Sequence, residues 1–337
     1  MHKSFFLAAM LASSSAMAME ALPMSPPIPA DNPMSDAKIE LGKQLYFDPR
    51  LSIDGTVSCN SCHNVMATGT DSRPTSVGIN GQRGGRNAPT VWNSAFLSAQ
   101  FWDGRAATLE DQAKGPPLNP IEMGMPSEKA VVDRLKAIPG YKEQFNSIFG
   151  EVSYNNMAKA IAAYERTLIT PDSPFDLYIK GNKAAINNKA VAGMKLFQEI
   201  GCSGCHSGVN FAGPKLPIGQ GFYQKFPAND SEYTAKYDFK ADKGRFEETK
   251  DKNDMHMWRV PTLRNVAVTA PYFHNGSVNT LSEAVRVMGK TQLNQTLNDK
   301  QVEDIVAFLE SLTGEFPVQT MPRLPDTDTT SLVGTIK

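Results

Sequence analysis

Apolar residues recur at helical spacing in several stretches of the chain. In residues 36–47 they fall on one helix face, and Asp48-Pro49 ends the pattern. The same spacing predicts helices over residues 127–138, 154–168, 187–200, 280–289 and 299–313. No strand pattern of any length appears, so we expect a mainly α fold.

Two of these helices have recognisable capping and stop residues in the sequence. Asn187 or Asn188 can cap the helix that Gly201 stops. Thr280 and Glu283 form a capping box, and Gly289 is the expected end of that helix. This end would place Met288 in the last turn.

Long polar stretches separate the predicted helices. Residues 68–89 and 208–254 read as long loops, which are often functional when ordered. A proline-rich arm over 21–33 precedes the first helix, and a polar tail follows Pro317. Residues 170–174 have the composition of a domain boundary. We therefore expect two domains, 19–170 and 171–337.

The first 18 residues have the pattern of a secretory signal. Lys3 precedes an apolar run over 5–12, and Ala16-Met17-Ala18 is a small-x-small cleavage site. No run in the chain is long enough to span a bilayer. We therefore expect a periplasmic protein without a membrane span. Loss of Lys3 changes the net charge of −1 to −2, a balance that argues against a nucleic-acid partner.

All four cysteines lie in two Cys-x-x-Cys-His motifs, Cys59 to His63 and Cys202 to His206. This pattern is typical of covalent c-type haem, in which both thiols form thioethers and the histidine binds iron. A thioredoxin-like redox pair would need neither the histidine nor two copies. A zinc site would leave the paired histidines unexplained. A predicted helix precedes each motif, so we expect two tandem cytochrome c-type haem domains with long loops.

The histidine count limits how the two irons can be ligated. After loss of the signal, His63, His206, His256 and His274 remain, and the motifs use the first two. Bis-histidine ligation of both haems would therefore require both of the others. An iron with His and Met transfers electrons, whereas an iron with an open face can bind peroxide.

Several long segments resemble the bacterial dihaem cytochrome c peroxidase family over nearly the whole mature chain. These segments are residues 86–90, 100–105, 112–116, 170–176, 263–265 and 269–274. The resemblance implies a peroxidatic haem on Cys59, Cys62 and His63. It implies an electron-accepting haem on Cys202, Cys205 and His206, with Met288 as its second ligand. Met255 and Met257 are the weaker alternatives to Met288.

The resemblance also implies roles for residues outside the haem motifs. Trp102 matches a tryptophan between the two haems, and Glu122 and Gln112 match the pocket where peroxide binds. A carboxylate there can take a proton from one peroxide oxygen and return it to the other, and an amide can orient the substrate. Asn87, Thr269 and Pro271 match the ligands of an interface calcium ion, and oxygen donors suit Ca²⁺. His274 fits the same interface, a propionate contact or a purely structural role.

One position departs from the family pattern. Many members cap the peroxidatic iron with a histidine in the loop after the first motif, and this chain has Ile79 there. Isoleucine cannot bind iron, so the first haem is either open or closed by another ligand. We predict that it is open in the oxidised protein and reacts with peroxide without prior reduction.

The resemblance predicts a peroxidase that takes electrons from a small cytochrome c or cupredoxin, and a homodimer. A non-enzymatic dihaem electron carrier is the first alternative, and it would need both irons six-coordinate. A relative that oxidises protein side chains is the second. Such relatives use tyrosine at the second haem, which Met288 argues against.

Overall fold

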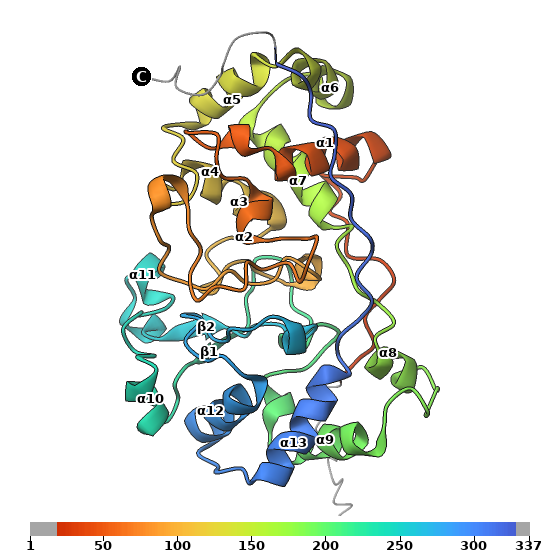
Figure 1. Ribbon diagram of the computed structural model, residues 1–337, viewed down its shortest axis with the longest axis vertical. Helices are drawn as coiled ribbons and strands as arrows, with labels where there is room; N and C mark the ends of the chain where they lie inside the picture. Colours follow the sequence, from red (N-terminus) through yellow and green to blue (C-terminus); the bar gives the residue numbers. More distant parts are fainter. Residues whose placement is uncertain (1–18, 328–337) are drawn as a thin grey trace, which may run out of the picture.

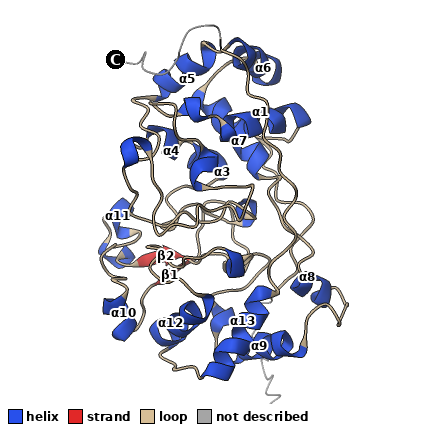
Figure 2. Cartoon of the chain, viewed as in Figure 1, coloured by secondary structure: helices blue, strands red, loops and turns tan. Residues whose placement is uncertain are grey.

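A computed structural model of the protein describes residues 19–327. The expected secretory signal, residues 1–18, lies outside the described residues. Figure 1 shows two helical halves stacked along the longest axis, with loops and a small sheet between them. Most of the chain is helix or loop (Figure 2), which confirms the mainly α prediction.

The helices divide between the two halves. The first half holds α1 (Asp36–Phe47), α2 (Cys59–Cys62), α3 (Leu109–Ala113), α4 (Gly115–Leu118), α5 (Glu128–Lys136), α6 (Pro139–Phe149) and α7 (Tyr154–Glu165). The second half holds α8 (Pro174–Ile179), α9 (Asn188–Glu199), α10 (Glu232–Lys236), α11 (Phe246–Thr249), α12 (Leu281–Leu293) and α13 (Asp299–Glu310). Strands β1 (Tyr223–Lys225) and β2 (Met257–Arg259) pair antiparallel.

Each half is built on one close helix crossing. Helix α1 crosses α7 at Gly42, where a Cβ would lie 1.9 Å from the Ala160 carbonyl oxygen. Helix α9 crosses α13 at Gly193, where a Cβ would lie 1.7 Å from the Asp304 carbonyl oxygen. Only glycine allows the backbones to approach so closely. The helix before each Cys-x-x-Cys-His motif therefore packs in the same way on the last long helix of its half.

Several expected helix ends are confirmed. Helix α1 has its predicted bounds, and the Asn187 side chain caps α9 by accepting a hydrogen bond from the Ala190 N–H. Thr280 caps α12 by accepting from the Glu283 N–H, as predicted, but the capping box is only half formed, because the Glu283 carboxylate accepts from Lys236 Nζ and the Tyr237 hydroxyl instead.

The helix predicted over 127–138 is α5, which ends before Pro139. Helix α6, which begins at Pro139, was missed; proline fits there because it lacks only an N–H that the first turn leaves unpaired. Two other expectations were wrong. Helix α12 runs past Gly289 to Leu293 and ends at Asn294, whose φ is 51°. Met288 therefore lies inside α12 rather than in its last turn. The two three-residue strands were missed because they are too short to show an alternating pattern.

Each end of the described chain packs on the opposite half of the molecule. The N-terminal arm lies on the second half, where the Leu22 N–H donates to Asp176 Oδ1 over 3.0 Å. Beyond α13 the chain returns to the first half (Figure 1). There Phe316 packs edge-on against Trp92 at 5.1 Å, and Arg50 Nη1 donates to the Pro325 carbonyl over 3.0 Å. Each half is thus completed by a segment from the far end of the sequence.

None of the helices between residues 19 and 327 combines the length and apolar character needed to cross a lipid bilayer.

Candidate functional site

The first Cys-x-x-Cys-His motif forms the single turn α2, which brings Cys59 and Cys62 onto one side. His63 follows directly, and its Nδ1 lies 2.9 Å from the Pro89 carbonyl oxygen. Since a carbonyl only accepts, Nδ1 carries the hydrogen and Nε2 keeps its lone pair. Burial lowers the pKa of His63, so the imidazole is neutral. The Tyr46 hydroxyl donates to the His63 carbonyl over 2.7 Å and fixes this residue against α1.

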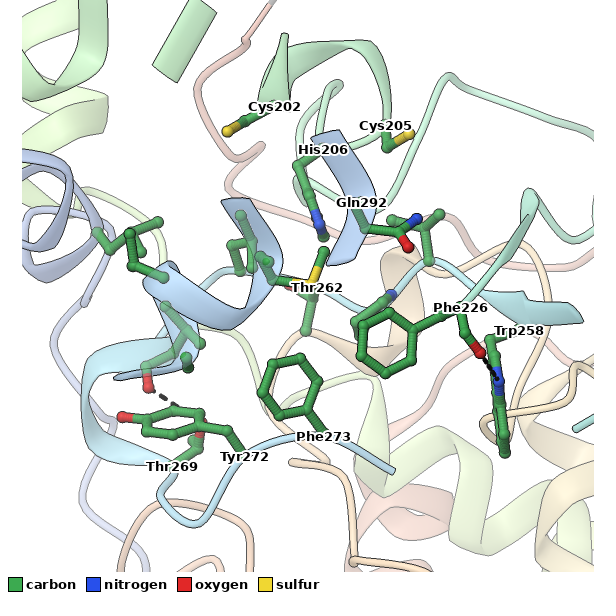
Figure 3. A pocket seen from close by; sticks show the side chains of 18 of the residues that line it. Cys202, Cys205, His206, Phe226, Trp258, Thr262, Thr269, Tyr272, Phe273 and Gln292 are labelled. Atoms are coloured by element: carbon green, nitrogen blue, oxygen red, sulfur yellow. Dashed lines mark hydrogen bonds between the residues drawn. The ribbon is translucent and has the colours of Figure 1, made fainter. Parts of the chain in front are cut away.

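The second motif repeats this arrangement. Its Cys202–Gly204 segment is a 3₁₀ turn, and His206 Nδ1 lies 3.0 Å from the Phe211 carbonyl oxygen. Burial again lowers the histidine pKa. Figure 3 shows the His206 ring pointing into a cavity that Phe226 and Phe273 also line.

Both motifs fit a covalently bound haem. Each offers two thiols and a neutral histidine whose free Nε2 can bind iron, and the cavity at the second motif is lined mainly by apolar side chains. A shared zinc site does not fit, because the two cysteine pairs lie in opposite halves. Within residues 19–327, no three His, Cys, Asp or Glu side chains converge as a metal site of that kind requires.

Met288 lines the same cavity as His206. It projects from α12 and packs against an aromatic cluster that includes Trp258 and Tyr272. The alternative ligands Met255 and Met257 do not line this cavity. The geometry therefore favours Met288 among the three.

His274 also lines this cavity and has an unsatisfied nitrogen. Its Nε2 is buried without a hydrogen-bond partner, and its ring stacks on Trp258 at 4.2 Å. Burial lowers its pKa to about 4. An unpaired buried nitrogen needs a partner, which a propionate of the haem would supply.

Trp102 connects the two halves at this point. Its Nε1 donates to the Asn87 carbonyl over 2.9 Å, and its own carbonyl accepts from the Arg259 N–H over 2.9 Å. Trp102 lines the cavity at His206. Pro89, whose carbonyl accepts the hydrogen bond from His63, lines the same cavity. Residues 87–89 therefore link the indole to the histidine of the first motif. This position agrees with a tryptophan between two haems.

The three expected calcium ligands lie around the same cavity. Asn87, Thr269 and Pro271 all line it, although they come from opposite halves. Asn87 Nδ2 donates to the Arg73 carbonyl over 2.8 Å, which leaves its Oδ1 for another partner. The Asn87 N–H donates to the His274 carbonyl over 2.7 Å and ties the two segments together.

Glu122 lies near the first motif, where its charge acts on the Cys59 and Cys62 thiols. Burial raises the pKa of its carboxyl, while the positive charge of Arg105 and a hydrogen bond from Asn119 oppose the rise. Asn119 Nδ2 donates to Glu122 Oε1 over 2.9 Å. A carboxyl whose pKa is raised by burial holds its proton more readily than an exposed one, so it can serve as acid as well as base.

Gln112 is half-buried on α3, and no hydrogen bond joins it to Glu122 within residues 19–327. The structure thus brings Trp102 and the three expected calcium ligands together around the cavity at His206. It shows no hydrogen bond between the two expected peroxide-binding residues within residues 19–327.

Ile79 occupies the place of the expected capping histidine. Its side chain is 5% exposed and belongs to the core of the first half. Its N–H donates to the Glu122 carbonyl over 2.9 Å. Gly124 packs directly against this side chain, since a Cβ there would lie 2.3 Å from Ile79 Cδ1, and its φ of 69° favours glycine. The loop after the first motif is therefore packed against the Glu122 segment by an aliphatic side chain.

Sequence reasoning missed the residues that hold this site in place. The contacts made by Tyr46, Pro89 and Asn119 are polar bonds that carry no sequence signature. Arg105 was part of a matching segment, but nothing in the sequence placed it near Glu122.

Comparison with known proteins gives consistent matches over both halves. A family profile described as Di-haem cytochrome c peroxidase matches residues 36–184, and one described as Cytochrome c matches residues 190–313. The cytochrome c551 peroxidase of Pseudomonas aeruginosa is 46% identical over 95% of this chain and 93% of its own length. That of Nitrosomonas europaea is 43% identical over 96% and 93%. The crystal structure of a MauG-like protein associated with microbial copper homeostasis superposes with a TM-score of 0.74 and 31% identity, covering 87% of this chain and 95% of that one.

Proposed function

Since this chain belongs to the di-haem cytochrome c peroxidase family, we propose that it reduces hydrogen peroxide to water with electrons from a small redox protein. Each peroxide takes up two electrons and two protons and gives two waters. The observation that carries this proposal is the difference between the two motifs. His206 shares its cavity with Met288, whereas the first motif has Ile79 and the carboxyl of Glu122 nearby.

We propose that the two motifs divide the reaction between them. Cys59, Cys62 and His63 would hold the peroxidatic haem, and Cys202, Cys205 and His206 the electron-accepting haem with Met288 as second ligand. Haem iron, when bound, supplies the redox chemistry and the site at which the O–O bond breaks. Trp102 would lie on the path of electrons between the two haems. Its hydrogen bond to the Asn87 carbonyl and its place in the lining of the cavity at His206 support this role.

Glu122 would be the general base of the reaction. Its carboxylate takes a proton from one peroxide oxygen and gives it to the other, so that the departing oxygen leaves as water. Asn119 holds the carboxyl in position through the bond to Oε1. Gln112 would orient peroxide by hydrogen bonding, as the resemblance implies.

We also propose the bounds of the domains, a calcium site, and the compartment and partners of the protein. The two haem domains would comprise residues 19–170 and 171–337. Asn87, Thr269 and Pro271 would hold one calcium ion between them. The protein would act in the periplasm, receive electrons from a cytochrome c or a cupredoxin, and form a homodimer.

The alternatives receive less support. A pure electron carrier needs a second ligand at the first haem, and the aliphatic Ile79 stands where that ligand is expected. A relative that oxidises side chains would use tyrosine at the second haem, whereas Met288 lines that cavity.

Rapid mixing of the oxidised dihaem protein with peroxide tests this function, with and without prior one-electron reduction. We expect a high-spin haem in the oxidised protein and direct reaction with peroxide, because Ile79 offers no iron ligand. Low-spin spectra for both haems, together with no reaction, would overturn this expectation.

The variant Ile79→His sharpens the test, and Ile79→Leu is its matched control. We expect the histidine to close the first haem and make the reaction depend on prior reduction. Leucine fills similar volume and supplies no ligand, so it should leave the direct reaction in place.

A further inference from the structure

One buried arginine in the lining of the cavity at His206 has no carboxylate partner within residues 19–327. Arg259 ends strand β2, is 4% exposed and lines this cavity. Its Nε donates to the Phe101 carbonyl over 2.9 Å, and its Nη1 donates to the Val260 carbonyl over 3.0 Å. Its Nη2 makes no hydrogen bond to any residue that the structure describes.

Arg259 carries a positive charge near neutral pH. Burial lowers its pKa to about 10, and the neighbouring Tyr223 and Asp103 oppose this fall. Asp103 is not its counter-ion, because that carboxylate already binds both Arg86 and Arg105. Tyr223 is no anion either, since burial raises the pKa of its phenol. A buried charge is costly unless an opposite charge lies beside it, so Arg259 requires an anion from outside the chain.

The other buried arginines of the described chain are satisfied by protein groups. Arg264 lines the same cavity, but its Nη1 lies 2.8 Å from Asp176 Oδ1, and both side chains are fully buried. Arg166 pairs with Glu110 over 2.7 Å. Arg134 has no ion pair, but it donates to three backbone carbonyls of the first half. The arginine of β2 is therefore the exception.

The cavity itself offers no protein anion. Among the described residues that line it there is no Asp or Glu. His274 is neutral there, because burial lowers its pKa to about 4. The haem that fits Cys202, Cys205 and His206 would bring propionate carboxylates into this cavity. An ionised propionate and a buried guanidinium can each offset the cost of burying the other.

We propose that Arg259 is the counter-ion of a propionate of the second haem, and that its charge raises the potential at which this haem accepts electrons. A cation beside a haem favours the reduced iron, which carries one positive charge fewer than the oxidised iron. Arg259 also holds the segment of Trp102, because its N–H donates to the Trp102 carbonyl over 2.9 Å. One residue thus joins the second haem to the tryptophan between the two halves.

The variant Arg259→Met tests the role of the charge, and Arg259→Lys is its conservative partner. Potentiometric titration of the dihaem protein, followed by haem absorption, measures the midpoint potential of the second haem. We expect methionine to lower this potential, because the propionate charge is then unbalanced. Lysine keeps the charge without the planar donor group, so it should restore most of the potential.

Arg245→Met is the matched control for loss of an arginine near β2. Arg245 pairs with Asp254 and does not line the cavity at His206. The potential of the second haem in this variant should equal that of the unaltered protein. An equal fall in Arg245→Met and Arg259→Met would show a general effect of charge and overturn the proposal.

A second measurement needs no substitution. Infrared spectroscopy of protein carrying isotope-labelled haem propionates follows their ionisation during a pH titration. We expect one propionate of the second haem to have a pKa below the ordinary carboxyl range, and Arg259→Met should raise that pKa by roughly 1–3 units. Ordinary pKa values for both propionates of this haem in the unaltered protein would overturn the ion pair.

Two further outcomes would also refute the proposal. Equal potentials in Arg259→Met and the unaltered protein would show that the charge has no effect on the haem. Equal falls in the methionine and lysine variants would assign Arg259 a structural role through its bonds to the Phe101 and Val260 carbonyls. These measurements require a haem at the second motif but no peroxide, so they remain decisive even if the protein proves not to be a peroxidase.

Discussion

Replacing Glu122 with glutamine removes one negative charge and almost no volume. Asn119 Nδ2 can still donate to the Oε1 of the new amide, as it does to Glu122 over 2.9 Å. The backbone bonds of residue 122, to the Asn119 carbonyl and from the Ile79 N–H, do not involve the side chain. The neutral hydrogen bond is weaker by about 1 kcal/mol, but the variant no longer buries a charge. We expect the free energy of unfolding to change by less than about 1 kcal/mol.

The effect on the reaction should be far larger. An amide cannot accept the proton from peroxide, and a positioned general base contributes roughly 10²–10⁴ in rate, or about 3–5 kcal/mol of the barrier. The effect must also depend on pH, because burial raises the pKa of the Glu122 carboxyl. Below that pKa the unaltered protein has a protonated carboxyl and has itself lost the base. The rates of the two proteins should therefore converge as the pH falls.

The assay is stopped-flow reaction of oxidised protein with peroxide across a pH series, with haem spectra and denaturant unfolding recorded on the same samples. Glu143→Gln, on the exposed face of α6, is the control for loss of one negative charge. Equal rates for Glu122→Gln and the unaltered protein would refute the role of this carboxyl. A rate ratio that stays constant over the whole pH series would refute it as well, since a base must lose its effect when protonated.

Three further predictions concern the rest of the molecule. Met288→Ala should abolish the methionine–iron absorption band and lower the potential of the second haem; an unchanged band would exclude Met288 as ligand. Gly193→Ala places a Cβ 1.7 Å from the Asp304 carbonyl oxygen, so urea unfolding should show a loss of about 1–3 kcal/mol, and an unaltered midpoint would contradict the close crossing. A calcium chelator should slow electron transfer between the haems, and Ca²⁺ should reverse this better than Mg²⁺; Asn87→Ala should remove the dependence, and a chelator without effect would exclude the ion.

Local signals in the sequence predicted much of the fold. Caps and glycine stops lie within a few residues of the helices they end, so α1 and α9 could be bounded from the sequence. The end of α12 could not, because Gly289 continues the helix where Leu297 packs against it. The short strands β1 and β2 depend on pairing between distant segments rather than on their own pattern.

Part of the candidate site could likewise be predicted from the sequence, and part could not. Both haem motifs are contiguous, so their residues could be named without a structure. The neighbours of Glu122 are less evident, because Arg105 acts on it through space and Ile79 reaches it through a backbone bond. The bond from Arg86 to Asp242 joins residues more than 150 positions apart, and only the folded chain brings them together.

The exchange of chain ends between the halves constrains the order of assembly. Residues near Leu22 are synthesised well before Asp176, on which they dock, whereas the segment around Phe316 and Pro325 is synthesised well after the first half, which it covers. Such contacts join positions far apart in sequence and are slow to form. The first half therefore cannot gain its covering until residues 316–325 have been synthesised, and a fragment cut near residue 170 would lack part of that covering. Two separately produced fragments should recover that covering only when mixed, by complementation between them.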